Sequence, residues 1–100
     1  MNTYQEEAAA FMTPDANNEN YLALGLCEEA GEVAKHFAKK IRGGVFDEKA
    51  TAKELGDVLW FVAQLAKRCG YSLEDIARIN LFKLRDRLAR GVINGNGDER

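Results

Sequence analysis

Several features that define other classes of protein are missing from this chain of 100 residues. It contains one proline, and no stretch approaches the ~20 apolar residues that a membrane span requires. Met1–Thr3 lacks the basic flank and apolar run of a secretory signal. Its 14 basic residues are outnumbered by 16 acidic ones, whereas nucleic-acid and membrane surfaces favour a basic excess. We therefore expect a cytoplasmic protein with neither a nucleic-acid polymer nor a membrane as partner.

Alternating apolar residues, which are typical of half-buried strands, are also absent, and the hydrophobic pattern predicts an all-α fold. Thr3 and Glu6 have the spacing of a capping box for the first helix, and Ser72 and Asp75 cap the fourth. The expected helices cover about 4–12, 19–41 and 47–69, and a fourth helix runs from the cap at Ser72 to about 90. We expect a single domain over 1–100, with an N-terminal helix and linker at 1–16 and a mobile tail at 92–100.

The third helix is apolar around most of its circumference. Its apolar residues are Leu55, Val58, Leu59, Trp60, Phe61, Val62, Leu65 and Ala66. A helix with this pattern must be covered on all sides, and a four-helix chain of this length covers the second side poorly. The pattern therefore predicts a four-helix bundle-like subunit that assembles into a dimer or a dimer of dimers.

Two pairs of carboxylates interrupt the apolar faces of the second and third helices. Glu29 falls inside an apolar stripe and Glu32 lies at its edge, while Glu54 and Asp57 repeat the same three-residue spacing. An unpaired ionised carboxylate inside such a stripe costs several kcal/mol. The alternative is an ordinary solvated face, which is what most isolated glutamate pairs at this spacing form.

Packing the two acidic faces together would bring four carboxylates close to one another. A divalent cation is the usual resolution of such repulsion, and oxygen ligands select Mg²⁺ or Mn²⁺ over Zn²⁺. Because Mg²⁺ normally completes its coordination with water and substrate phosphates, the pattern favours a polyphosphate substrate over a structural metal.

Three further side chains share one face of the fourth helix, namely Asn80, Lys83 and Arg87. Such a face can donate hydrogen bonds to phosphate oxygens, although on periodicity alone a solvated face paired with Asp86 is somewhat more typical. Phe61 continues the line of Glu54 and Asp57 by one turn, so it is a candidate for stacking on a nucleobase, with core packing as the alternative.

The segments Glu28-Glu29-Ala30-Gly31-Glu32 and Glu54-Leu55-Gly56-Asp57 resemble the EExxE and ExxD signature of the MazG-like all-α nucleoside triphosphate pyrophosphohydrolases. Asn80-Leu81-Phe82-Lys83 resembles the Asn-x-x-Lys segment of the same family, and the likeness extends over about residues 20–98.

The resemblance implies hydrolysis of (deoxy)nucleoside triphosphates to a nucleoside monophosphate and pyrophosphate. It implies Glu29, Glu32, Glu54 and Asp57 as Mg²⁺ ligands, and Glu28 as an outer carboxylate or as the base that orients the attacking water. It favours phosphate contact for Asn80 and Lys83, and it implies a homodimer or homotetramer with sites shared between subunits.

Two other functions stay open at this point. Phosphoribosyl-ATP pyrophosphohydrolases are a related all-helical group that would use the same carboxylates. A non-catalytic helical dimerisation module would pair through the third helix and leave the carboxylates at a rim.

Overall fold

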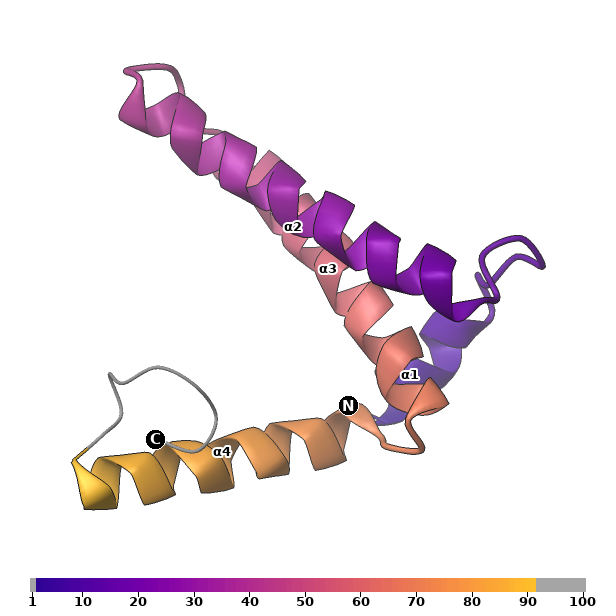
Figure 1. The fold of residues 1–100 in the computed structure, drawn as a ribbon. Helices are drawn as coiled ribbons and strands as arrows, with labels where there is room; N and C mark the ends of the chain where they lie inside the picture. Colours follow the sequence, from indigo (N-terminus) through magenta and orange to yellow (C-terminus); the bar gives the residue numbers. More distant parts are fainter. Residues whose placement is uncertain (1, 92–100) are drawn as a thin grey trace.

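The computed structural model describes residues 2–91, which form four α-helices (Figure 1). They are α1 (Asn2–Ala9), α2 (Glu19–Ile41), α3 (Glu48–Arg68) and α4 (Leu73–Arg90). The described part of the chain contains no strand, so the all-α prediction is confirmed. No helix in this part is both long enough and apolar enough to cross a membrane. The predicted mobile tail lies outside the described residues.

The first helix differs from its predicted bounds. It already includes Asn2 and ends at Ala9, so Thr3 lies inside the helix and does not cap it. Beyond Ala9 the chain turns through hydrogen bonds to the third residue back, from Ala10 N to Glu7 O at 3.2 Å and from Phe11 N to Ala8 O at 3.1 Å. This tightening ends the helix at Ala9, before the apolar pattern ends.

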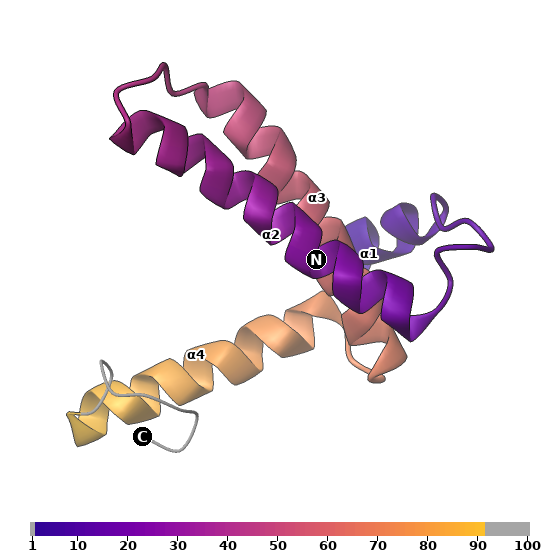
Figure 2. The same ribbon diagram turned by 45° about the horizontal axis from the view of Figure 1, so that its top comes forward.

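Helices α2 and α3 lie side by side and antiparallel, as a long hairpin (Figures 1 and 2). Each helix starts with a polar side chain that accepts a hydrogen bond from a free backbone N–H group. The Asn18 side chain accepts from Tyr21 N at 2.7 Å, and the Asp47 carboxylate accepts from Ala50 N at 2.9 Å. At the hairpin's tip Gly43 adopts a φ of 84°, a conformation that glycine reaches without strain.

Helix α1 packs on the C-terminal half of α3 and is attached to it by side-chain hydrogen bonds. The Trp60 indole donates to the Ala8 carbonyl oxygen at 3.0 Å. The buried Gln5 amide donates to Ala63 O at 3.0 Å and to Tyr71 O at 3.3 Å. These bonds fix the surface of α3 that α1 covers.

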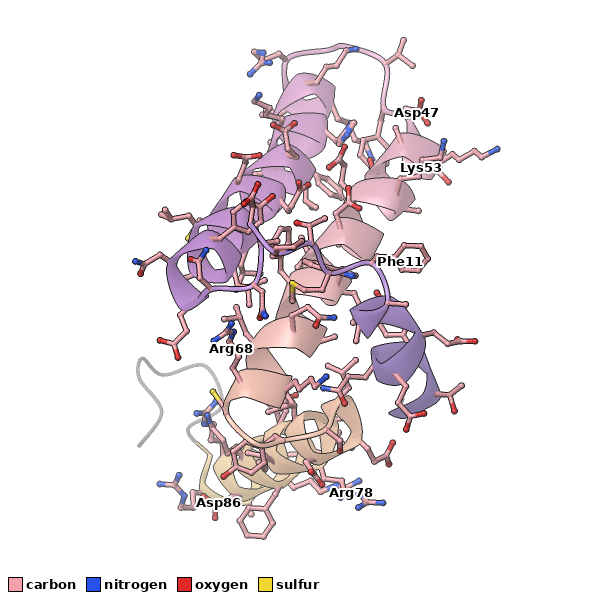
Figure 3. The ribbon with its side chains drawn as sticks, turned by 90° about the vertical axis from the view of Figure 1, so that its right-hand side faces the viewer. Phe11, Asp47, Lys53, Arg68, Arg78 and Asp86 are labelled. Carbon is pink, nitrogen blue, oxygen red and sulfur yellow. The ribbon has the colours of Figure 1, made fainter. Side chains whose placement is uncertain are left out.

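Helix α4 leaves the end of α3 and points away from the hairpin (Figures 1 and 2). Ser72 and Asp75 form the predicted capping box, and the hydrogen bonds from Ser72 hold the pKa of the Asp75 carboxyl below its usual range. Within the described residues the backbone of α4 comes close to those of α3 and α1 but not to that of α2, although Ile76 of α4 and Leu26 of α2 line a common hollow. Figure 3 shows Asp47 and Lys53, at the start of α3, far from Arg78 and Asp86 on α4.

The open arrangement leaves a small core and much apolar surface. Its radius of gyration, 16.0 Å, exceeds the about 13 Å of a compact domain of this length. Leu22 and Leu73 are the largest fully buried side chains, whereas Phe82 on α4 is 74% exposed and Leu55 on α3 is 52% exposed. As the sequence predicts, one chain leaves part of α3 uncovered.

Candidate metal centre

Three of the predicted metal ligands meet between the two helices of the hairpin. Glu29 comes from the middle of α2, and Glu54 and Asp57 come from consecutive turns of α3. One carboxylate oxygen from each lies within 4.8 Å of the other two. Glu29 and Glu54 are half-buried and Asp57 is exposed, so the cluster opens to water on the Asp57 side.

The electrostatics of the cluster are unfavourable for three separate charges. Partial burial raises the pKa of Glu29 above its usual value, as do its hydrogen bond with the Glu54 carboxyl and repulsion from Asp57, Glu54 and Glu28. A raised carboxyl pKa means that the ionised form is held at a cost. A positive partner at this position would remove that cost.

The donor set fits a hard divalent cation. Three carboxylates supply oxygen ligands only, without the nitrogen or sulfur that Zn²⁺ prefers. Mg²⁺ is commonly held by a few carboxylates and keeps other coordination positions for water and phosphate oxygens. Glu29, Glu54 and Asp57 would therefore hold Mg²⁺ or Mn²⁺ and leave room for a substrate.

The fourth predicted ligand, Glu32, lies one turn beyond Glu29 and outside this cluster. Its carboxylate is 3.4 Å from the Lys35 ammonium, in an exposed ion pair on the same helix. Such pairs contribute little to stability, so this one would oppose a change of rotamer only weakly. The assignment of Glu32 as a ligand stays a prediction.

A hollow of ≈ 290 Å³ adjoins the cluster on the α2 side. It is lined by Tyr21, Leu24, Gly25, Glu28, Glu29 and Phe61. Two predicted site residues, Glu28 and Phe61, therefore lie with Glu29 in one hollow. Sequence reasoning missed Tyr21 and Gly25, although their four-residue spacing from each other and from Glu29 places all three on one face of α2.

Gly25 explains the position of the Phe61 ring. A Cβ atom on Gly25 would overlap the edge of that ring, so only glycine allows this close approach of α3 to α2. Trp60 packs edge-on against Phe61, with ring centroids 5.0 Å apart. The centroid of the Tyr21 ring lies 6.4 Å from that of Phe61. Phe61 and Tyr21 thus form an aromatic wall of the hollow beside Glu29.

A larger hollow of ≈ 710 Å³ lies on the other side of Asp57, between α1 and α3. Tyr4 and Phe11 from the N-terminal segment face Asp57 and Trp60 across it. Phe11 is 75% exposed and projects from the chain after α1 (Figure 3). No role is predicted for α1 from the sequence, because nothing local to it resembles a binding motif.

Comparison with known proteins agrees with this geometry. The model of the MazG nucleotide pyrophosphohydrolase domain matches residues 17–91. This chain belongs to the MazG family. Gene 37 protein of Mycobacterium phage L5 is 43% identical over 86 residues, which cover 81% of this chain and 75% of that protein. No solved structure matches the chain.

Membership of the MazG family supports nucleotide pyrophosphohydrolase activity in general. The matched range includes both acidic segments and the whole of α4, whereas α1 lies before it. The wall that α1 adds to the larger hollow is therefore outside the part of this MazG chain that the family model covers.

The remaining predicted site residues lie on α4, and one chain does not bring them to the carboxylates. Asn80 is exposed, Lys83 is half-buried and Arg87 is buried. The described part of α4 diverges from α2 along its length (Figures 1 and 2), so these three positions lie apart from Glu29 within one chain. Their assignment to substrate binding stays a prediction.

Proposed function

We propose that this MazG domain hydrolyses (deoxy)nucleoside triphosphates between the α- and β-phosphates, giving a nucleoside monophosphate and pyrophosphate in a Mg²⁺-dependent reaction. The observation that carries the proposal is the meeting of Glu29, Glu54 and Asp57 within 4.8 Å on the α2–α3 hairpin. The family match supports the general activity.

These three carboxylates would hold Mg²⁺, with Glu32 joining them if it leaves Lys35; Mn²⁺ would be a substitute because it accepts the same oxygen ligands. When bound, the ion supplies positive charge beside phosphate oxygens, where negative charge must be offset during hydrolysis.

Glu28 is proposed to orient the attacking water. Its exposed carboxylate lines the same hollow as Glu29, so it can accept a hydrogen bond from a water held there. The water oxygen forms a bond to the α-phosphorus, the bond from that phosphorus to the bridging oxygen breaks, and pyrophosphate leaves. The proton of the water passes to the Glu28 carboxylate and then to solvent.

The aromatic wall is proposed to hold the nucleobase. Phe61 and Tyr21 line the hollow beside Glu29, and stacking on an aromatic ring contributes about 1–3 kcal/mol per base while tolerating any base. Such a wall supplies affinity, whereas selection among bases requires polar contacts.

We further propose that the protein is a homodimer or homotetramer in which α4 crosses to a partner subunit. Exposed apolar residues on α4 include Ile79, Leu81, Phe82 and Leu88. Covering them would also bring Asn80, Lys83 and Arg87 of one subunit toward the triphosphate bound by another.

Light scattering tests the proposed assembly, with two or four times the chain mass expected and a monomer as the contrary result. Phe82→Ser should weaken assembly, whereas Phe11→Ser, at a side chain equally exposed, should not.

The activity is tested with a panel of nucleotides that includes phosphoribosyl-ATP, with Mg²⁺ and separation of products by ion-exchange chromatography. Carrying out the reaction in ¹⁸O-water should place the label in the monophosphate, because attack is at the α-phosphorus. Nucleoside diphosphate with orthophosphate, or label in pyrophosphate, would contradict the mechanism. Glu29→Gln should abolish turnover while circular dichroism shows unchanged helicity.

A further inference from the structure

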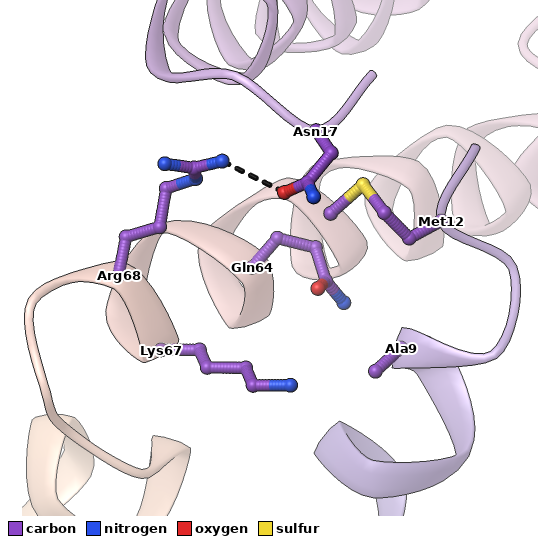
Figure 4. Close-up of a pocket in the computed structure, with 6 residues that line it drawn as sticks. All are labelled: Ala9, Met12, Asn17, Gln64, Lys67 and Arg68. Carbon is purple, nitrogen blue, oxygen red and sulfur yellow. Dashed lines mark hydrogen bonds between the residues drawn. The ribbon is translucent and has the colours of Figure 1, made fainter. Parts of the chain in front are cut away.

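A separate pocket of ≈ 420 Å³ lies where α1, the chain after it and the C-terminal half of α3 meet (Figure 4). It is lined by Ala9, Met12, Asn17, Gln64, Lys67 and Arg68. None of these residues belongs to the carboxylate cluster. Gln64 lies seven residues after Asp57, which is about 10 Å along α3 at 1.5 Å per residue.

The Gln64 amide makes this pocket unusual. The residue is 2% exposed, and its Nε2 atom is buried without a hydrogen-bond partner among the described residues. Buried polar atoms in folded proteins are nearly always paired, and leaving one unpaired destabilises the native state. In Figure 4 the amide lies at the wall of the pocket, between Met12, Ala9 and Lys67. An acceptor bound in the pocket would satisfy this donor once the amide turns toward it.

The other polar groups in the pocket are also mainly donors. The Lys67 ammonium points toward the pocket (Figure 4). The Arg68 guanidinium donates to Asn17 Oδ1 at 2.7 Å, which holds it at the rim and occupies the Asn17 oxygen. Among the residues that the structure describes, no carboxylate lines the pocket, and the highly exposed Glu19 carboxylate lies 4.0 Å from the Arg68 guanidinium.

We propose that this pocket binds the phosphate group of a small molecule. A phosphate offers several charged acceptor oxygens, which suits an amide, an ammonium and a guanidinium that line one pocket from the same helix. The pocket is larger than orthophosphate alone, so pyrophosphate or a nucleoside monophosphate also fits its size. Rotation of the amide about its broad last torsion turns the NH₂ group toward such a ligand at little cost.

Binding at this site is distinguishable from binding at the metal centre because only the metal centre needs a divalent cation to hold an anion. Without a divalent ion the three clustered carboxylates repel an anion, whereas the Gln64–Lys67–Arg68 pocket needs no metal. Binding measured after removal of divalent cations on a chelating resin therefore reports on the pocket. The inference stands or falls independently of the proposed hydrolysis.

The test is thermal unfolding and isothermal titration of the cation-free full chain with orthophosphate, pyrophosphate and a nucleoside monophosphate. Sodium chloride at equal ionic strength is the control for general screening. At least one of the phosphates should raise the Tm above the chloride control, because a ligand that binds the native state stabilises it. The arm with the largest shift identifies the source of the phosphate group. Equal Tm values in all arms would overturn the proposal.

Two variants assign the binding to this pocket. Gln64→Leu keeps the side-chain volume but removes the unpaired donor, so the Tm without ligand should rise and the phosphate-dependent shift should be lost. Lys67→Gln should weaken phosphate binding about tenfold, the effect of losing one charge-assisted hydrogen bond. Lys53→Gln makes the same charge change at an exposed position near the start of α3 and should leave binding within about twofold. Equal losses at Lys67 and Lys53 would show that binding is a general charge effect and would refute the site.

Discussion

Replacing Glu29 by glutamine should have opposite effects on the stability of the protein with and without Mg²⁺. Without divalent cations, the wild-type chain holds Glu29 close to Glu54 and Asp57, with carboxylate oxygens within 4.8 Å of one another. Two unit charges at that separation repel by about 0.9 kcal/mol in water and by about 3.5 kcal/mol at an effective dielectric constant of about 20. Glutamine has nearly the same shape and removes both repulsions.

The cluster is open to water at Asp57, so the lower value is the appropriate one for each pair. We expect Glu29→Gln to stabilise the cation-free protein at pH 8 and low salt by about 1–2 kcal/mol. For a domain of this size each kcal/mol shifts the Tm by about 4–8 °C. Saturating Mg²⁺ should reverse the order, because it raises the Tm of the wild type through a site that the variant has damaged.

Thermal unfolding followed by circular dichroism, with and without Mg²⁺, measures all four Tm values. Glu28→Gln is the matched control, since it removes the same charge one residue earlier, from an exposed side chain outside the cluster. The control should shift the cation-free Tm little and keep the response to Mg²⁺, although turnover should fall. A Glu29→Gln protein that is no more stable than wild type without cations, or that responds fully to Mg²⁺, would refute the assignment.

Three further predictions concern pH, packing and capping. Because the folded-state pKa of Glu29 is raised above the ordinary 4.5, the cation-free native state binds this proton more tightly than the unfolded chain. Acidification from pH 8 through the raised pKa should therefore stabilise the wild type relative to Glu29→Gln, and a constant difference in Tm would contradict this. Gly25→Ala should destabilise by about 1–3 kcal/mol in urea unfolding, because the new methyl group meets Phe61, while Gly31→Ala, with open space around it, should stabilise by about 0.5–1 kcal/mol. Ser72→Ala should cost about 1 kcal/mol by the same measurement, and no change would mean that the capping box is dispensable.

The helices themselves could be predicted from sequence because their signals are local. Helix α2 has the predicted bounds, and α3 differs from its prediction by one residue at each end. Asn18, Asp47 and Ser72 each cap the backbone within three residues of their own position, so no distant contact is needed to place them. Helix α1 was less predictable, because the apolar pattern continues through Phe11 although the chain has already turned.

The candidate site could be predicted in part. Three-residue spacing on a helix puts Glu54 and Asp57 on one face whatever the fold, and an acidic residue in an apolar stripe marks Glu29. That Glu29 and not Glu32 meets the α3 pair depends on the register of the hairpin, which the approach of Phe61 to Gly25 helps to set. Periodicity within one helix carries no information on the register between two.

The sequence by itself therefore determined the all-α class, the capping box of α4 and the acidic residues of the site, since each depends on neighbours within one or two turns. Tertiary structure alone decided the direction of α4, the hollow between α1 and Asp57, and the burial of the Gln64 amide, whose Nε2 atom has no hydrogen-bond partner among the described residues. These features arise where segments distant in the chain pack together, and their energies depend on contacts that no local pattern encodes.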